Sequence, residues 1–431
     1  MPESSPPMEK AAHELPTDSL HTTTSANWFT AKRMLAHGAI LAACLWSVYI
    51  WNLSTPGLLD RNGNLKGTDF LHFYTLGSLA VRHEGAELYD MNAQAALAAE
   101  LVPEAAGKRY LPLYPPQVSI LFAPFASLPY GWAFLLWTCC SAALYAICCY
   151  LIWRACPSLR PHGITVFLLA PAYPAFFHLI AWGQTSALAL VSFTLMFFLL
   201  RERHRFLAGI ALGLLIFKPQ LGLAAAVVFL LIGEWRLVTG AVLSALAELS
   251  IGIAYYGLTP LREWLHMLRN TGSVLPWLEP RPYQTHSLRT FWSMLLPWSD
   301  VAFGLYVVSA AVVLALAVSL WRKNDSPLAL RYSSLLLATV LVAPHLTVYD
   351  LVVLAPALLL ATDWLIGKKS SARGPLAILL YLVYILPLLS PLLRWTHLQL
   401  SVIAMTACVY EIWRASRYAN TETASQVLAG G

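Results

Sequence analysis

The stretch GIALGLLIFKPQLGLAAAVVFLLIGEWR, from Gly209 to Arg236, decides the fold class of this chain. It consists of two short apolar runs separated by one lysine, Lys218, and the proline that follows it. Proline lacks a backbone donor and favours a break in a helix. A lysine within a membrane helix costs about 2.5–3.5 kcal/mol to insert, so it tends to have a partner or a role. The stretch therefore predicts two short membrane helices that meet at a charged residue.

The whole chain is more apolar than a soluble domain, since 58% of its 431 residues are hydrophobic and 12% are charged. It predicts an all-α polytopic membrane protein with about twelve transmembrane helices and short amphipathic helices in its outer loops. The run 116–129 is short and flanked by prolines, and it predicts a half-buried dip instead of a crossing. The expected spans are 35–53, 131–153, 163–181, 184–200, 206–218, 220–233, 237–257, 301–321, 329–344, 346–364, 375–393 and 398–413.

Lysine and arginine set the expected orientation. Lys32 and Arg33 precede the first span, which predicts a cytoplasmic N-terminus. The same alternation places the other basic clusters and the C-terminus inside. These clusters explain the net charge of +6 without a nucleic-acid partner. They are Arg154/Arg160, Arg201/Arg203/Arg205, Arg236, Arg322/Lys323, Lys368/Lys369/Arg373, and Arg414 with Arg417.

This topology predicts one transmembrane domain, 34–415, between a disordered cytoplasmic tail, 1–33, and a second cytoplasmic tail, 416–431. Its two large outer loops are 55–130 and 258–299. The protein would be a multi-pass protein of the cell membrane with its active site on the outer, extracytoplasmic face. No Walker, GxGxxG or HExxH motif is present, so a nucleotide-dependent reaction inside is not expected. The seven cysteines fall in or beside apolar runs, without zinc-site spacing, and are expected to pack.

Asp69 is the candidate catalytic residue, in "LKGTDFLHFYTLGSLAVRHEGAELYD" (Leu65 to Asp90). It stands where the first outer loop begins, before a segment that resembles an amphipathic helix lying in the membrane interface. Desolvation against such a face raises the pKa of a carboxylate toward the range suited to a general base. The alternative is that Asp69 is only the N-cap of that helix.

Two candidates near the apolar runs could bind substrate. Lys218 could contact an anion such as a lipid phosphate, or it could instead extend to the interface. Gln184 follows a tight turn between two spans, where it could bind a sugar hydroxyl or cap the next helix. Tyr114, in the proline turn of the first outer loop, is a further candidate substrate-binding residue.

The late outer loop supplies the remaining candidates. "PRPYQTHSLRTFW" brings Ser287 and Arg289 together with aromatic and amide groups, a composition that suits a sugar phosphate and also a solvated loop. His345, at the outer mouth of two spans, could hydrogen-bond a phosphate or the acceptor, or it could be structural. Glu248 stands alone in an apolar span and has no assigned role.

Six motifs together resemble glycosyltransferase family 87, a membrane group with the GT-C architecture. The order and spacing hold over about residues 35–400. The pieces are "GTDF..FY.......RHEGAELYD" (Gly67 to Asp90), "LYPPQVSILFAPFASLP" (Leu113 to Pro129), "WGQTSALAL" (Trp182 to Leu190), "GLLIFKPQLGL" (Gly213 to Leu223), "QTHSLRTF" (Gln284 to Phe291) and "APHLTVYDL" (Ala343 to Leu351).

The resemblance implies a hexosyltransferase that uses a polyprenyl-phosphate sugar, often mannose, with a lipid or glycan as acceptor. It assigns the catalytic role to Asp69 and places Lys218 and His345 in the donor site. It implies no cofactor and no metal, because the leaving group is a lipid monophosphate. The chain departs from the family pattern at Gln284–Ser287, where Asn-x-Ser is expected, and at Asp350, where many members carry His. Both departures leave the sugar and acceptor open.

Other classes remain as alternatives. A transporter or flippase of a lipid-linked sugar would share an apolar groove and a phosphate contact. It would more typically show internal repeats and ionisable residues at the membrane midplane. A ligase of whole glycans and a non-catalytic assembly subunit are further alternatives. Replacing Asp69 with Asn separates a cap, which tolerates Asn, from a base.

Overall fold

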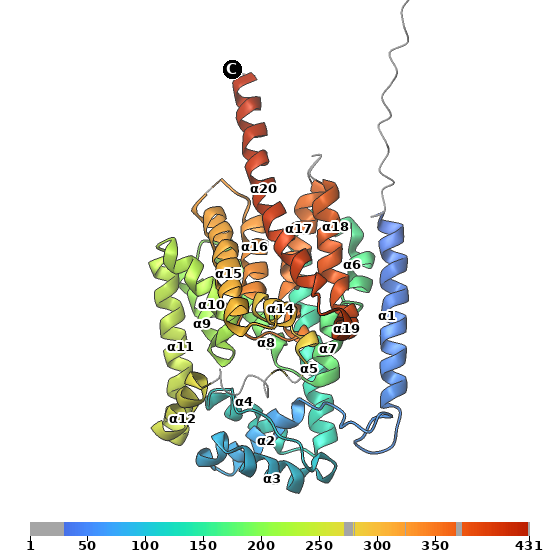
Figure 1. Ribbon diagram of the computed structural model, residues 1–431, viewed down its shortest axis with the longest axis vertical. Coiled ribbons are helices and arrows are strands. Elements are labelled where there is room, and N and C mark those ends of the chain that lie inside the picture. The colour runs from blue at the N-terminus through green and yellow to red at the C-terminus, as the bar shows by residue number, and fades with distance from the viewer. Residues whose placement is uncertain (1–29, 271–278, 280, 324, 368–372, 430–431) are drawn as a thin grey trace, which may run out of the picture.

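The structure, a computed structural model, describes residues 30–270, 279, 281–323, 325–367 and 373–429 (Figure 1). Within these residues all regular elements are helices, and β pairing is limited to two isolated bridges. The helices are α1 Ala31–Leu53, α2 Phe70–Val81, η1 Gly85–Tyr89, α3 Met91–Leu101, η2 Pro103–Ala105, α4 Gln117–Ala126, α5 Tyr130–Arg154, η3 Arg160–His162, α6 Gly163–Leu169, α7 Pro174–Trp182, α8 Ser186–Arg201, α9 Arg205–Gly213, η4 Leu214–Phe217, α10 Pro219–Leu231, α11 Trp235–Tyr256, α12 Leu258–Arg269, η5 Pro282–Gln284, α14 Leu288–Leu295, α15 Ser299–Arg322, α16 Leu328–Val342, η6 Val348–Leu354, α17 Ala355–Gly367, α18 Arg373–Ile385, η7 Leu386–Leu392, α19 Leu393–Thr396 and α20 Leu400–Ala429.

The apolar helices confirm a membrane protein. Six of the described helices are long and apolar enough to cross a bilayer, or seven if the bent pair Arg160–Leu169 and Pro174–Trp182 is one span. Each remaining expected span coincides with a shorter or less apolar helix, so about twelve crossings stays a prediction. The predicted break at Lys218 is confirmed, because η4 ends at Phe217 and α10 begins at Pro219.

The two ends of the bundle differ. Figure 1 shows the start of α1 and the C-terminal end of α20 at one end, and α2, α3, α4 and α12 at the other. α20 runs to Ala429 and so continues through most of the segment expected as a C-terminal tail. Residues 1–29 of the expected N-terminal tail, Lys368 and Lys369, and residues 271–278 and 280 of the late loop lie outside the described residues.

α2 is not the amphipathic surface helix that we predicted. Its residues from Phe70 to Ala80 are all buried, and Val81 alone is exposed. The reason is α4, which packs against it from later in the same loop. A Cβ at Gly77 would lie 2.4 Å from the carbonyl oxygen of Phe122, so only glycine allows this approach. The run 116–129 therefore forms a packing partner for α2, not a free groove.

The turn between α7 and α8 holds the start of α2. Gly183 ends α7 with a φ of 71°, and a Cβ there would lie 2.6 Å from the Cβ of Phe70. The backbone N–H of Asp69 donates to the carbonyl of Trp182 at 3.1 Å. This contact brings Asp69 beside Gln184, the middle residue of the turn.

The late loop is fastened to the turn between α16 and η6. Thr285 and Thr347 form an antiparallel bridge, and the N–H of His286 donates to the carbonyl of Leu346 at 3.1 Å. Thr347 and Asp350 form a capping box at the start of η6. Two segments far apart in sequence thus form one wall opposite α2.

Candidate active site

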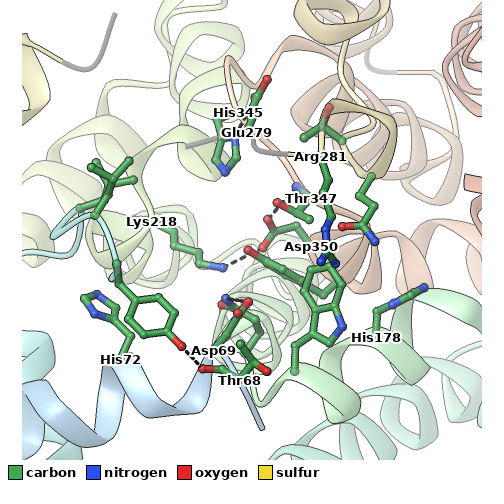
Figure 2. Close-up of a pocket in the computed structure, with 18 of the residues that line it drawn as sticks. Thr68, Asp69, His72, His178, Lys218, Glu279, Arg281, His345, Thr347 and Asp350 are labelled. Atoms are coloured by element: carbon green, nitrogen blue, oxygen red, sulfur yellow. Dashed lines mark hydrogen bonds and ion pairs between the residues drawn. The ribbon is translucent and has the colours of Figure 1, made fainter. Parts of the chain in front are cut away.

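A cavity of about 1510 Å³ lies between the loop of residues 54–129, the α7–α8 turn, the break at Lys218 and the late loop (Figure 2). Its size suits a sugar together with parts of a donor and an acceptor. Six of the seven predicted site residues line it: Asp69, Tyr114, Gln184, Lys218, Arg289 and His345. Ser287 does not join them. It is fully buried, and its Oγ accepts from the N–H of Thr290 at 3.5 Å as the N-cap of α14.

Asp69 occupies the N-cap position of α2 but does not act as a cap. Its side chain makes no capping hydrogen bond, whereas the Asp90 carboxylate accepts from the N–H groups of Asn92 and Ala93 at the start of α3. The Asp69 carboxylate lines the cavity instead. Burial raises its pKa to about 6, although a hydrogen bond from Gln184 and the charges of Lys218 and Arg281 act in the opposite direction. A carboxylate of this kind is ionised at neutral pH and is basic enough to accept a proton.

A short chain of polar groups orients that carboxylate. Gln184 Nε2 donates to Asp69 Oδ2 at 2.7 Å, and Tyr114 Oη donates to Gln184 Oε1 at 3.4 Å. Tyr110 hydrogen-bonds the carbonyl of Thr68, next to Asp69. Burial raises the pKa of both tyrosines, so they remain neutral hydrogen-bond donors.

Lys218 lies in a buried ion pair. Its Nζ is 2.9 Å from Asp350 Oδ1 and donates to Ser186 Oγ at 3.1 Å (Figure 2). Both charged side chains are nearly inaccessible, with 3% and 2% of the residue exposed for Lys218 and Asp350. The lysine therefore does not extend to the interface, and its charge is compensated inside the protein.

A second group of paired charges lies on the side of the cavity that the late loop forms. His345 Nδ1 is 2.8 Å from Glu279 Oε1, and Arg289 forms an ion pair with the same oxygen. Burial alone would raise the pKa of Glu279, but His345 and Arg289 together hold it below its usual value. Glu279 thus links two residues that sequence analysis had proposed as phosphate contacts.

Residues 113–344, just over half of the chain, match the profile of glycosyltransferase family 87. The chain belongs to glycosyltransferase family 87. No curated protein matches, and no solved structure matches. The resemblance drawn from the motifs is confirmed, and the apolar helices and the family together identify a membrane glycosyltransferase. Asp69 lies 44 residues before the matched segment and His345 directly follows it, so their place in this family 87 enzyme rests on the geometry of the cavity.

Sequence analysis missed three groups in the site of this glycosyltransferase. Asp350 was seen only as a departure from the family pattern, although Thr347-x-x-Asp350 fits a capping box. Glu279 carried no signal, because a lone glutamate in a polar loop is ordinary. His72 lines the cavity and is 4% exposed, and both its ring nitrogens lack a hydrogen-bond partner among the described residues. Within the same residues no three His, Cys, Asp or Glu side chains lie close enough together to bind a metal ion.

Proposed function

We propose that this enzyme transfers a hexose, mannose in the first instance, from a polyprenyl-phosphate sugar to a hydroxyl of a lipid or glycan acceptor. The reaction takes place at the extracytoplasmic face of the cell membrane, as the distribution of Lys and Arg indicates. The observation that carries the proposal is the Asp69 carboxylate, which lines a large cavity, caps no helix and has a pKa of about 6.

Asp69 is the general base of a single displacement. It takes the proton from the acceptor hydroxyl while that oxygen forms a bond to the anomeric carbon of the sugar. The bond from that carbon to the phosphate oxygen breaks, and the electron pair leaves with polyprenyl phosphate. One displacement at the anomeric carbon inverts its configuration, and a positioned base contributes about 10²–10⁴ in rate.

Two other carboxylates that line the cavity support this assignment. Asp350 is paired with Lys218, and Glu279 is paired with Arg289. Asp69 instead has a neutral amide as its hydrogen-bond partner, so it is the one of these three carboxylates that is not held in an ion pair.

The donor lipid would leave the cavity on the side of α10 and α15. The lining there is apolar and includes Leu223, Leu296 and Phe303. Leu223 and Phe303 are also 43% and 60% exposed on the bundle surface, where a bilayer would meet them. The short helices near Lys218 therefore support this path for the lipid tail, whereas the run 116–129 packs against α2.

The test is sugar transfer by the purified protein in lipid nanodiscs. Labelled polyprenyl-phosphate mannose, polyprenyl-phosphate glucose and a nucleotide-activated mannose would each be supplied with a crude membrane acceptor extract. The proposal expects label in an acceptor only from a polyprenyl-phosphate donor, with inverted configuration. Transfer from the nucleotide sugar alone, or movement of an unchanged lipid-linked sugar across proteoliposomes without transfer, would overturn it.

A further inference from the structure

The cations that line the cavity fall into two groups. Lys218 and Arg289 are each within an ion pair, with Asp350 and Glu279 respectively. Among the described residues, Lys66, Lys108, Arg109 and Arg281 line the cavity without a carboxylate partner, and Lys66 donates to the carbonyls of Thr55 and Gly57. The first group offers little net positive charge to an incoming phosphate.

Freeing a paired cation would be costly. Lys218 and Asp350 are both buried, and removing one partner from such a pair leaves an uncompensated charge, which is strongly destabilising. A phosphate that drew Lys218 away would leave Asp350 in that state. A cation outside these ion pairs can therefore bind the phosphate without leaving a buried charge unpaired.

In-line displacement selects among these four cations. The base and the leaving group must lie on opposite sides of the anomeric carbon. Lys66 lies three residues before Asp69 in the chain, so it belongs to the wall that carries the base. Lys108 and Arg109 belong to the same wall, because they directly precede Tyr110, whose hydroxyl bonds to Thr68. Figure 2 places Arg281 on the opposite side of the cavity from Asp69.

The backbone at Arg281 leads directly into the fastened part of the late loop. Arg281 immediately precedes η5, which leads into Thr285, and Thr285 pairs with Thr347 beside the capping box of η6. The side chain itself is exposed to the cavity and is free of ion pairs within the described structure. A guanidinium can bind two phosphate oxygens at once, which a lysine ammonium cannot do in the same fixed geometry.

We propose that Arg281 is the phosphate-binding residue of this site, contacting the donor phosphate and the prenyl phosphate that departs. This inference rests on the proposed function. Sequence analysis gave the role of phosphate contact to Lys218, Arg289 and His345. Arg281 lies outside the Lys218–Asp350 pair and outside the group that Glu279 forms with Arg289 and His345. As the sugar–phosphate bond breaks, charge develops on the phosphate oxygens, where the guanidinium stabilises it.

The experiment measures binding of a short prenyl phosphate, so that it does not depend on transfer. Farnesyl phosphate, farnesol and inorganic phosphate would be titrated into the full-length protein in nanodiscs, with Trp fluorescence as readout. The variants are Arg281→Gln and Arg281→Lys, with Lys108→Gln and Arg109→Gln as matched controls. A thermal melt would verify that each variant is folded.

We expect Arg281→Gln to weaken the binding of farnesyl phosphate by about 10- to 100-fold, as for a lost charge-assisted hydrogen bond. The affinity for farnesol should be unchanged. Arg281→Lys should recover part of the loss, and the two control variants should change the affinity less. Saturable inorganic phosphate binding that is as tight as farnesyl phosphate would identify free phosphate as the ligand. An unchanged affinity in Arg281→Gln, or a larger loss in either control, would overturn the assignment. Arg281-dependent binding without any sugar transfer would reject the proposed reaction and leave this inference standing.

Discussion

Gln184 Nε2 donates a hydrogen bond to Asp69 Oδ2 at 2.7 Å, across 115 residues of sequence. The bond joins the middle residue of the α7–α8 turn to the residue directly before α2. It gives Gln184 a role that the sequence did not suggest, since the alternatives were sugar binding and capping. The amide fixes one oxygen of the base and favours its ionised form.

Removal of this amide should therefore change the pH dependence of transfer. In Gln184→Leu, the pKa of Asp69 rises, because the hydrogen bond that lowers it is gone. The acidic limb of kcat/KM against pH should move to higher pH, and a pKa higher by about 1 should lower the rate on that limb nearly tenfold. Tyr114→Phe, which removes a longer hydrogen bond to Gln184, should show a smaller change. Equal profiles for wild type and Gln184→Leu would show that the bond does not act on the base.

The wild-type enzyme should lose activity in acid. Asp69 has a pKa of about 6 and must be ionised to accept a proton. Below pH 6, log kcat/KM should fall by about one unit per pH unit, and above pH 7 it should be flat as far as Asp69 is concerned. The measurement is initial rate at low donor concentration between pH 4.5 and 8. A profile that stays flat to pH 4.5 would place the titrating base elsewhere.

The same carboxylate should cost stability at neutral pH. Folding raises its pKa from 3.8 to about 6, so between these values the folded state binds more protons than the unfolded state, and stability falls as pH rises. This difference in pKa corresponds to an upper limit of about 3 kcal/mol at pH 7. Asp69→Asn should therefore melt at a higher temperature than wild type at pH 7.5, and the difference should shrink toward pH 4. A lower melting temperature for Asp69→Asn at pH 7.5 would contradict this.

The Lys218–Asp350 pair should behave as one unit. Lys218→Met or Asp350→Leu alone leaves a buried charge and should destabilise by about 3–5 kcal/mol, whereas the double variant should recover much of that loss. Thermal melts of the four proteins complete the cycle. Additive losses in the double variant would mean that the two side chains do not compensate each other.

The close approach of α2 and α4 can be tested at Gly77. Gly77→Ala places a Cβ 2.4 Å from the Phe122 carbonyl oxygen, and the forced displacement should destabilise by about 1–3 kcal/mol. Gly304→Ala in α15 is the matched control, because nothing lies within 4 Å of its added methyl group. Equal melting temperatures for the two variants would show that α2 can move away from α4 without cost.

The sequence predicted what depends on local pattern. The apolar runs were sufficient to predict a helical membrane protein, and the proline after Lys218 was sufficient to predict the break there. The motifs were sufficient to name the family. The bend of 48° inside the expected span 163–181 was not predicted. The burial of α2 could not be predicted, because it depends on contact with Phe122 more than forty residues later in the chain. Asp350 lies 132 residues from Lys218 along the chain, and Glu279 lies 66 residues from His345. Nothing in the sequence therefore indicated that these two candidates are held by carboxylates.

The most direct test of Asp69 as the general base compares Asp69→Asn with Asp90→Asn in transfer of labelled sugar. Both variants exchange a carboxylate for an amide in the same loop, but Asp90 is a true N-cap and caps tolerate Asn. Folding of each would be checked by thermal melt. We expect Asp90→Asn to retain wild-type activity and folded Asp69→Asn to lose about 10²–10⁴ in rate. Equal activity of wild type and Asp69→Asn would contradict the assignment of Asp69 as the base.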